Sequence, residues 1–118
     1  MYSIEDLTLE AQEGLDRFWF IQRIRFFNRT DETIATRLYI RDDLFIQAFK
    51  GQLTQSLYLA LIDGNRRIFG IDYESGEWHV HPYESPHKHE PYPEGLEARP
   101  LMKFLSIIET LLIEQDLL

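Results

Sequence analysis

All four histidines of the 118-residue chain lie between residues 77 and 93, in the stretch EWHVHPYESPHKHEPYP. They form two His-x-His pairs, His79 with His81 and His87 with His89. Imidazole takes up and releases protons near neutral pH, and it is also a frequent metal ligand. The spacing therefore predicts an acid–base site or a metal site, and a polar loop without special chemistry is the third interpretation.

The acid–base interpretation concerns a phosphodiester substrate. Cleavage of a phosphodiester requires a base and an acid, and two imidazoles can supply both. We expect His87 and His89 to form this pair, with His79 or His81 assisting. Lys88 lies between the first two, where its ammonium group can stabilise the negative charge that develops on the phosphoryl oxygens.

The metal interpretation uses the same histidines, with Asp72 or Glu77 as an additional oxygen ligand. The chain has no cysteine, which removes thiolate ligands and a cysteine nucleophile. It also lacks HExxH or another spacing typical of a metalloenzyme family. We therefore assign no metal ion and no cofactor.

The segment EWHVH is expected to be the last strand of a sheet. Side chains alternate along a strand, so His79 and His81 point to one face while Trp78 and Val80 point to the core. A long irregular loop follows, stiffened by four prolines that reduce the entropy lost on ordering it. The chemistry depends on whether this loop folds back over the face that carries His79 and His81.

A second candidate site lies in residues 17–41, which carry six arginines against two acidic residues. Alternation along two paired strands places a basic and aromatic set on one sheet face: Arg23, Arg25, Arg37, Tyr39 and Arg41. Such a face can bind single-stranded RNA through phosphate contacts and base stacking. The other interpretation is a solvated face whose arginines pair with the many carboxylates. The net charge of −8 argues against a large phosphate-binding surface and against nonspecific binding of duplex DNA.

The spacing of apolar residues along the chain and the residues typical of turns predict one α+β domain over residues 1–118. Ser3 and Asp6 resemble a capping box that begins a helix, and Pro100 suits the first turn of a final helix. Period-two segments predict strands at 18–29, at 33–41, after the Asp42-Asp43 turn, and three more within 55–82. We therefore expect an antiparallel meander of five or six strands, with an N-terminal and a C-terminal helix packed on one face.

Apolar side chains are also expected on the second face of this sheet. They are Ile21, Phe27, Phe45 and Phe49. An apolar patch on an open sheet predicts a partner chain, and a second copy of this chain would form a homodimer. The patch is equally explained as the core face of a curved sheet.

Targeting signals and membrane segments are not evident in the sequence. The N-terminus lacks the basic and apolar regions of a signal peptide, and no run approaches the roughly 18 apolar residues of a membrane span. The lack of cysteine fits a reducing compartment. These features predict a cytoplasmic protein without a membrane partner.

The order of these features resembles the small TumE-type proteins of prokaryotic toxin–antitoxin loci. The resemblance covers most of the chain and rests on LALIDGNRRIFGIDY, with Asp72 in that strand, and on Ser85-Pro86-His87-Lys88-His89. It implies a toxin-like component with a cognate antitoxin protein as partner. It also implies RNA as the target, with a metal-independent ribonuclease activity. The alternative is a non-catalytic binding or assembly module whose histidine loop is structural or binds a metal.

Overall fold

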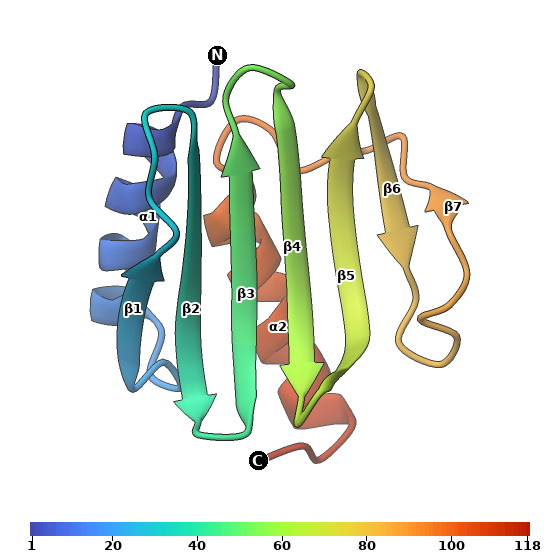
Figure 1. Cartoon of the computed structure of the whole chain (residues 1–118). Coiled ribbons are helices and arrows are strands. Elements are labelled where there is room, and N and C mark those ends of the chain that lie inside the picture. The colour runs from blue at the N-terminus through green and yellow to red at the C-terminus, as the bar shows by residue number, and fades with distance from the viewer.

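One antiparallel sheet and two helices form the two layers of the structure, a computed structural model that describes residues 1–118 (Figure 1). The seven strands lie in the order of the chain, and both helices pack on the same face. The elements are α1 (Ile4–Arg17), β1 (Arg23–Phe27), β2 (Thr33–Arg41), β3 (Leu44–Gly51), β4 (Ser56–Asp63), β5 (Arg66–Glu74), β6 (Glu77–His81), β7 (Glu90–Pro91) and α2 (Pro100–Glu114). Neither helix is long and apolar enough to cross a membrane.

This architecture confirms the predicted α+β meander with an N-terminal and a C-terminal helix on one face. The additional strand is β7, a two-residue segment that pairs with β6. The capping box is also confirmed. The Asp6 backbone N–H donates to Ser3 Oγ at 3.1 Å, and the Ser3 N–H donates to Asp6 Oδ2 at 2.9 Å.

The predicted first strand at 18–29 is wrong at both ends, because β1 spans only Arg23–Phe27. The helix α1 continues to Arg17, and the N–H of Phe18 caps it by donating to the Gly14 carbonyl. The next residues form a turn that inserts Phe20 and Ile21 into the core. Ile21 therefore belongs to the core and does not lie on the second face of the sheet.

The hydrophobic core lies between the sheet and the helices. Every second residue of the central strands points toward α1 and α2, where these side chains are fully buried. The core members with no exposed surface are Leu7, Ala11, Leu38, Ile46, Ala48, Leu59, Leu61, Leu101, Phe104, Leu105 and Ile108. Phe69 stacks on Phe104 with ring centroids 5.8 Å apart, which joins β5 to α2.

The alternate strand residues form the opposite side of the sheet, which we call the open face because no helix covers it (Figure 1). Strand register assigns its main members, which are Arg23, Arg25, Phe27, Arg37, Tyr39, Phe45, Gln47, Phe49, Tyr58, Asp72, Glu74, His79 and His81. Both candidate sites therefore share one surface, with the arginines toward β1 and the histidines toward β6.

Gly14 determines how closely the two helices approach. An alanine Cβ at this position would lie 2.7 Å from Leu105 Cδ1 of α2. Alanine is favoured in helices by about 1 kcal/mol over glycine, but overpacking a core costs about 1–3 kcal/mol. We expect Gly14→Ala to lower the free energy of unfolding by about 1 kcal/mol, measured by urea denaturation.

The matched control removes the obstructing methyl group. In a Leu105→Val background, Gly14→Ala should no longer destabilise the protein, because valine has no Cδ atom. If Gly14→Ala stabilises the parent by its full helix preference, the helices are not in contact at this point.

Candidate functional site

A buried carboxylate–imidazole pair forms the centre of the histidine site. In the β5–β6 hairpin, Asp72 lies opposite His79 and Gly70 lies opposite His81. The Asp72 carboxylate reaches diagonally to His81, with Oδ2 at 3.0 Å from Nε2. Asp72 is 8% exposed and His81 is 7% exposed, so water hardly competes for this hydrogen bond.

The loop after β6 folds back over this pair. Strand β7 pairs with β6, with Glu90 opposite Val80 and Pro91 opposite His79. This pairing places the His89 ring 4.1 Å from the ring of His79 and 4.9 Å from that of His81, between ring centroids. Three imidazoles of the two predicted pairs therefore converge on the open face.

His87 and Lys88 lie outside this cluster. Two successive turns, in which Ser85 N–H donates to the Pro82 carbonyl and Lys88 N–H donates to the Ser85 carbonyl, turn the loop outward. His87 is exposed and has no ring contact, hydrogen bond or ion pair with the other histidines. The structure thus brings His89 to His79 and His81, and it does not bring His87 to His89 as the expected pair.

Hydrogen bonding and burial give the clustered groups different properties. With Asp72 ionised, its carboxylate accepts from His81 Nε2–H, which leaves the lone pair on Nδ1. The Nδ1 atoms of His79 and His81 are buried and have no hydrogen-bond partner. His89 is exposed, so it is the imidazole of the cluster that a substrate reaches first.

Burial also raises the pKa of Asp72 above its usual value of 3.8, although His81 acts in the opposite direction through its charge and its hydrogen bond. The desolvated carboxylate therefore holds its proton more tightly than an exposed aspartate does.

The metal interpretation is not favoured by this geometry. No three side chains of histidine, aspartate or glutamate are grouped so that they could hold a metal ion. The rings of His81 and His89 are stacked with an interplanar angle of 18°, and ring-nitrogen lone pairs lie in the ring planes. They do not point toward one centre, and the expected oxygen ligand Asp72 is bonded to His81.

The arginine site is built on aromatic rings. Register places Arg25 opposite Arg37 and Arg23 opposite Tyr39. The Arg23 guanidinium lies 3.7 Å above the Tyr39 ring, and that of Arg37 lies 4.5 Å from the ring centre of Phe45. These contacts hold both guanidinium planes on the sheet.

Charge pairing removes only part of this positive surface. Arg23 pairs with Asp42 at 3.1 Å, whereas Arg25 forms no ion pair and Arg37 donates to the neutral Gln47 at 2.9 Å. The interaction with Arg37 is the largest cause of a lowered pKa of the Tyr39 hydroxyl, and the charges of Arg23 and Arg25 add to it. Arg25 and Arg37 therefore remain unpaired with carboxylates in this arginine site.

Arg41 does not belong to this site, and its predicted position is wrong. A register irregularity between Tyr39 and Arg41 turns it away from the open face. Its Nε donates to Asp43 at 2.9 Å, and its Nη1 donates to the Leu117 carbonyl at 3.0 Å. Arg41 therefore anchors the chain after α2.

Aromatic side chains connect the two ends of the open face. Phe49 on β3 and Tyr58 on β4 have ring centroids 6.0 Å apart, and the Tyr58 hydroxyl donates to Glu74. Phe49 is half-buried, as is Phe27, while Phe45 is buried beneath Arg37. The expected apolar patch is thus reduced to two half-buried rings within a polar surface.

The pairing of Asp72 with His81 was not predicted, although Asp72 was considered as an oxygen ligand. The signal was present in the Ser75-Gly76 turn. A two-residue turn places Glu74 opposite Glu77, and the resulting register brings Asp72 and His81 to the same face as neighbours.

Comparisons with known proteins gave no match: no family model, no curated protein and no solved structure is similar to this chain. The function is therefore inferred from the geometry of the open face.

The raised pKa of Asp72 predicts a specific pH dependence of stability. Between the usual value of 3.8 and the higher folded value, the folded state binds more protons than the unfolded state. The contribution of Asp72 to stability therefore falls as pH rises through this window. Relative to Asp72→Asn, the parent should lose stability in urea titrations as pH rises from 3.8 through the raised folded-state pKa of Asp72.

A second background tests the cause of this shift. Without the imidazole that lowers the pKa of Asp72, the same comparison in a His81→Gln background should give a larger loss. A parent that gains stability over Asp72→Asn as pH rises would show that the contact with His81 outweighs burial.

Proposed function

We propose that this chain is the toxin-like component of a prokaryotic toxin–antitoxin pair, and that it binds and cleaves single-stranded RNA on the open face. The observation that carries the proposal is the location of both sites on one uncovered surface. Unpaired arginines on aromatic rings lie toward β1, and a cluster of three imidazoles lies toward β6.

The dimensions of the sheet suit this task. Neighbouring strands are about 4.8 Å apart, so β2 and β6 are separated by about 19 Å across the open face. A short single-stranded segment can lie along this distance, with phosphates on Arg25 and Arg37 and bases on the rings of Phe49 and Tyr58. The substrate would then reach the imidazoles at its other end.

The distribution of charge supports RNA binding despite the net charge of −8. Five of the acidic residues lie within α1, which packs on the side of the sheet opposite the open face (Figure 1). Most of this acidic surface is therefore separated from an RNA bound across the strands by the thickness of the sheet.

The imidazole cluster can supply both proton transfers of RNA cleavage. A base takes the proton of the 2′-hydroxyl, the 2′-oxygen attacks phosphorus, and an acid protonates the departing 5′-oxygen. We assign these steps to exposed His89 and adjacent His79. His81, bonded to Asp72, positions the stacked ring of His89. The products are a 2′,3′-cyclic phosphate and a free 5′-hydroxyl.

The resemblance to TumE-type proteins supports the toxin part of the proposal and implies a small antitoxin as the partner. An antitoxin seated on the open face would cover the arginines and the histidines together. Inhibition would then follow from simple exclusion of RNA.

The second candidate is a non-catalytic binding or assembly module. It is favoured by the burial of the Nδ1 atoms of His79 and His81, which are closed to solvent and have no hydrogen-bond partner. On this interpretation, the imidazole stack serves only to hold the β7 loop against β6.

Substitution of His89 separates the two functions. His89→Ala should reduce cleavage of a fluorescent RNA by about 100-fold or more, because acid–base catalysis contributes about 10²–10⁴ to rates. His87→Ala is the matched control on the same loop and should retain parental activity. The assay contains EDTA and measures fragments with cyclic phosphate ends, and growth arrest on expression gives the second readout.

Several outcomes contradict this assignment. Equal activity of His89→Ala and the parent would exclude His89 from catalysis. A loss in His87→Ala as large as that in His89→Ala would show that the imidazoles act in another arrangement. RNA binding by the parent without any cleavage would support the binding module.

The arginines predict a salt-dependent affinity that is independent of catalysis. Arg25→Gln and Arg37→Gln should each weaken RNA binding and reduce the slope of log K against log salt by about 0.7 per lost phosphate contact. Arg17→Gln, on the helix layer, removes the same charge and should leave the slope unchanged. Fluorescence anisotropy at several salt concentrations measures this difference. Equal slopes in all three variants would place RNA elsewhere.

A further inference from the structure

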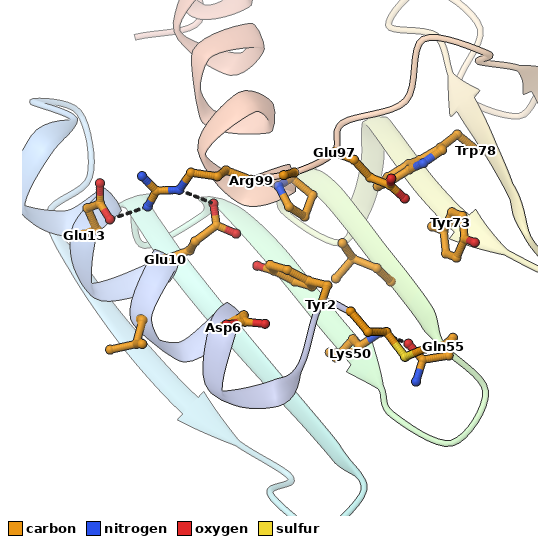
Figure 2. Close-up of a pocket in the computed structure, with 15 residues that line it drawn as sticks. Tyr2, Asp6, Glu10, Glu13, Lys50, Gln55, Tyr73, Trp78, Glu97 and Arg99 are labelled. Atoms are coloured by element: carbon orange, nitrogen blue, oxygen red, sulfur yellow. Dashed lines mark hydrogen bonds and ion pairs between the residues drawn. The ribbon is translucent and has the colours of Figure 1, made fainter.

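A cavity of about 620 Å³ lies on the helix-covered side of the sheet, which is the side opposite the histidine cluster (Figure 2). Its walls come from α1, from strands β3 to β6 and from residues 97–100 before and at the start of α2. Small-molecule sites in proteins have roughly 300–1,000 Å³. Four carboxylates line it, of which Asp6 is engaged in the capping box, Glu10 and Glu13 pair with Arg99, and Glu97 has no ion pair. The other side chains that give the cavity chemical character are Tyr2, Lys50, Gln55, Tyr73 and Trp78.

Lys50 is the unusual member of this cavity. It points from β3 toward the helix layer and is 2% exposed, yet it takes part in none of the ion pairs of the protein. Its one polar contact is a long hydrogen bond of 3.4 Å to Gln55 Oε1. Burial lowers the pKa of Lys50. Lysine is seldom fully buried without a counterion, because an unpaired charge is costly to desolvate.

Two other polar groups of the cavity lack hydrogen-bond partners, and they can form a hydrogen bond with each other. Tyr2 Oη and Glu10 Oε1 are buried without partners, but the hydroxyl points toward the carboxylate (Figure 2). Burial and the neighbouring Glu10 raise the pKa of Tyr2, so the hydroxyl stays protonated. After a small rotation it can donate a hydrogen bond to the Glu10 carboxylate. The second Glu10 oxygen already accepts from the Met102 backbone N–H at 3.0 Å. The missing partner is therefore an anion for Lys50.

Aromatic rings form one wall of the cavity. Tyr73 and Trp78 are cross-strand neighbours with ring centroids 5.1 Å apart. The backbone of Gly95 lies against the indole, since a Cβ on that residue would be 2.7 Å from Trp78 Nε1. This contact fixes a flat apolar surface at the side of the cavity.

We propose that this cavity binds a small organic monocarboxylate with an aromatic or similarly flat body. The carboxylate pairs with Lys50, of whose three N–H donors only one is used, and the body lies against Tyr73 and Trp78. A single buried cation matches one negative charge. A phosphate group requires more donors, and the Arg99 guanidinium is engaged by Glu13 and Glu10. This binding site is separate from the proposed RNA surface and does not depend on it.

Trp78 provides a direct readout of binding. The chain has two tryptophans, and Trp19 is 60% exposed and bonded to Glu109, so Trp19→Phe leaves Trp78 as the fluorophore. In this background, titration with phenylacetate should give saturable quenching. The matched probes phenethylamine and 2-phenylethanol carry the same ring without the negative charge, and they should bind much more weakly.

Substitution of Lys50 tests the assigned contact. Lys50→Met should weaken phenylacetate binding by about tenfold or more, because the charge-assisted hydrogen bond is lost. Lys88→Met removes the same charge from the exposed histidine loop and should leave the affinity unchanged.

Thermal unfolding supplies an independent measurement that also shows whether the variants fold. Without a probe, Lys50→Met should have a higher Tm than the parent, because no charge is buried. Phenylacetate should raise the Tm of the parent and leave that of Lys50→Met unchanged. The proposal is overturned if both proteins bind phenylacetate equally, or if phenethylamine binds as tightly. It is also overturned if acetate, phenylacetate and indole-3-acetate all fail to quench Trp78 at millimolar concentration.

Discussion

The structure depends on one constraint, the alternation of side chains along strands whose sheet is covered by helices on one face only. Burial of the apolar set against α1 and α2 fixes which residues face inward, and every intervening residue then lies on the open face. On β6 this separates Trp78 and Val80 from His79 and His81. The Ser75-Gly76 turn, with φ values of 54° and 80°, adopts the left-handed conformation of a tight hairpin and sets the register. A slip of one residue would move the imidazoles into the core.

Three carboxyl or ammonium groups are buried against the rule that charges avoid the interior, namely Glu10, Lys50 and Asp72, and the last two lie beside the β5–β6 hairpin. Asp72 is buried on the open face beneath His89, and Lys50 is buried on the helix side near Tyr73. Asp72 is compensated by a hydrogen bond to His81, whereas Lys50 has only a long contact with Gln55. Local violations of this kind are often found at functional sites. The two groups therefore differ in their surroundings, since Asp72 has a partner within the protein and Lys50 takes part in no ion pair.

The sequence predicted those features that depend on local pattern. The bounds of β2, the capping box at Ser3 and the start of α2 at Pro100 follow from periodicity and turn chemistry, and the structure has them where they were expected. The start of β1 was missed because FWFIQ has strand-like residues, while the core takes up Phe20 and Ile21 within a turn. The loss of Arg41 from the basic face requires a register irregularity that no periodicity reveals. His89 is among the candidates that the sequence predicts. That it packs against His79 and His81, and not against His87, depends on the pairing of the two-residue strand β7. The alternation of residue types along a strand does not reveal which segments pair with each other when they are distant in sequence.

The segment between β6 and α2 explains how both sides of the hairpin are held at once. It crosses the edge of the sheet at β7, where the Tyr92 N–H donates to the Trp78 carbonyl at 2.9 Å. Before this crossing, His89 packs on the imidazoles of the open face, and after it Gly95 packs on the indole of the helix side. One stretch of chain therefore packs against both faces of strand β6. The prolines of this stretch reduce its conformational freedom in the unfolded state. The entropy cost of ordering this stretch is shared between the two contacts, so the histidine cluster and the aromatic wall of the cavity stabilise each other. The long irregular loop is therefore a structural element in its own right, and its order is a condition for either site.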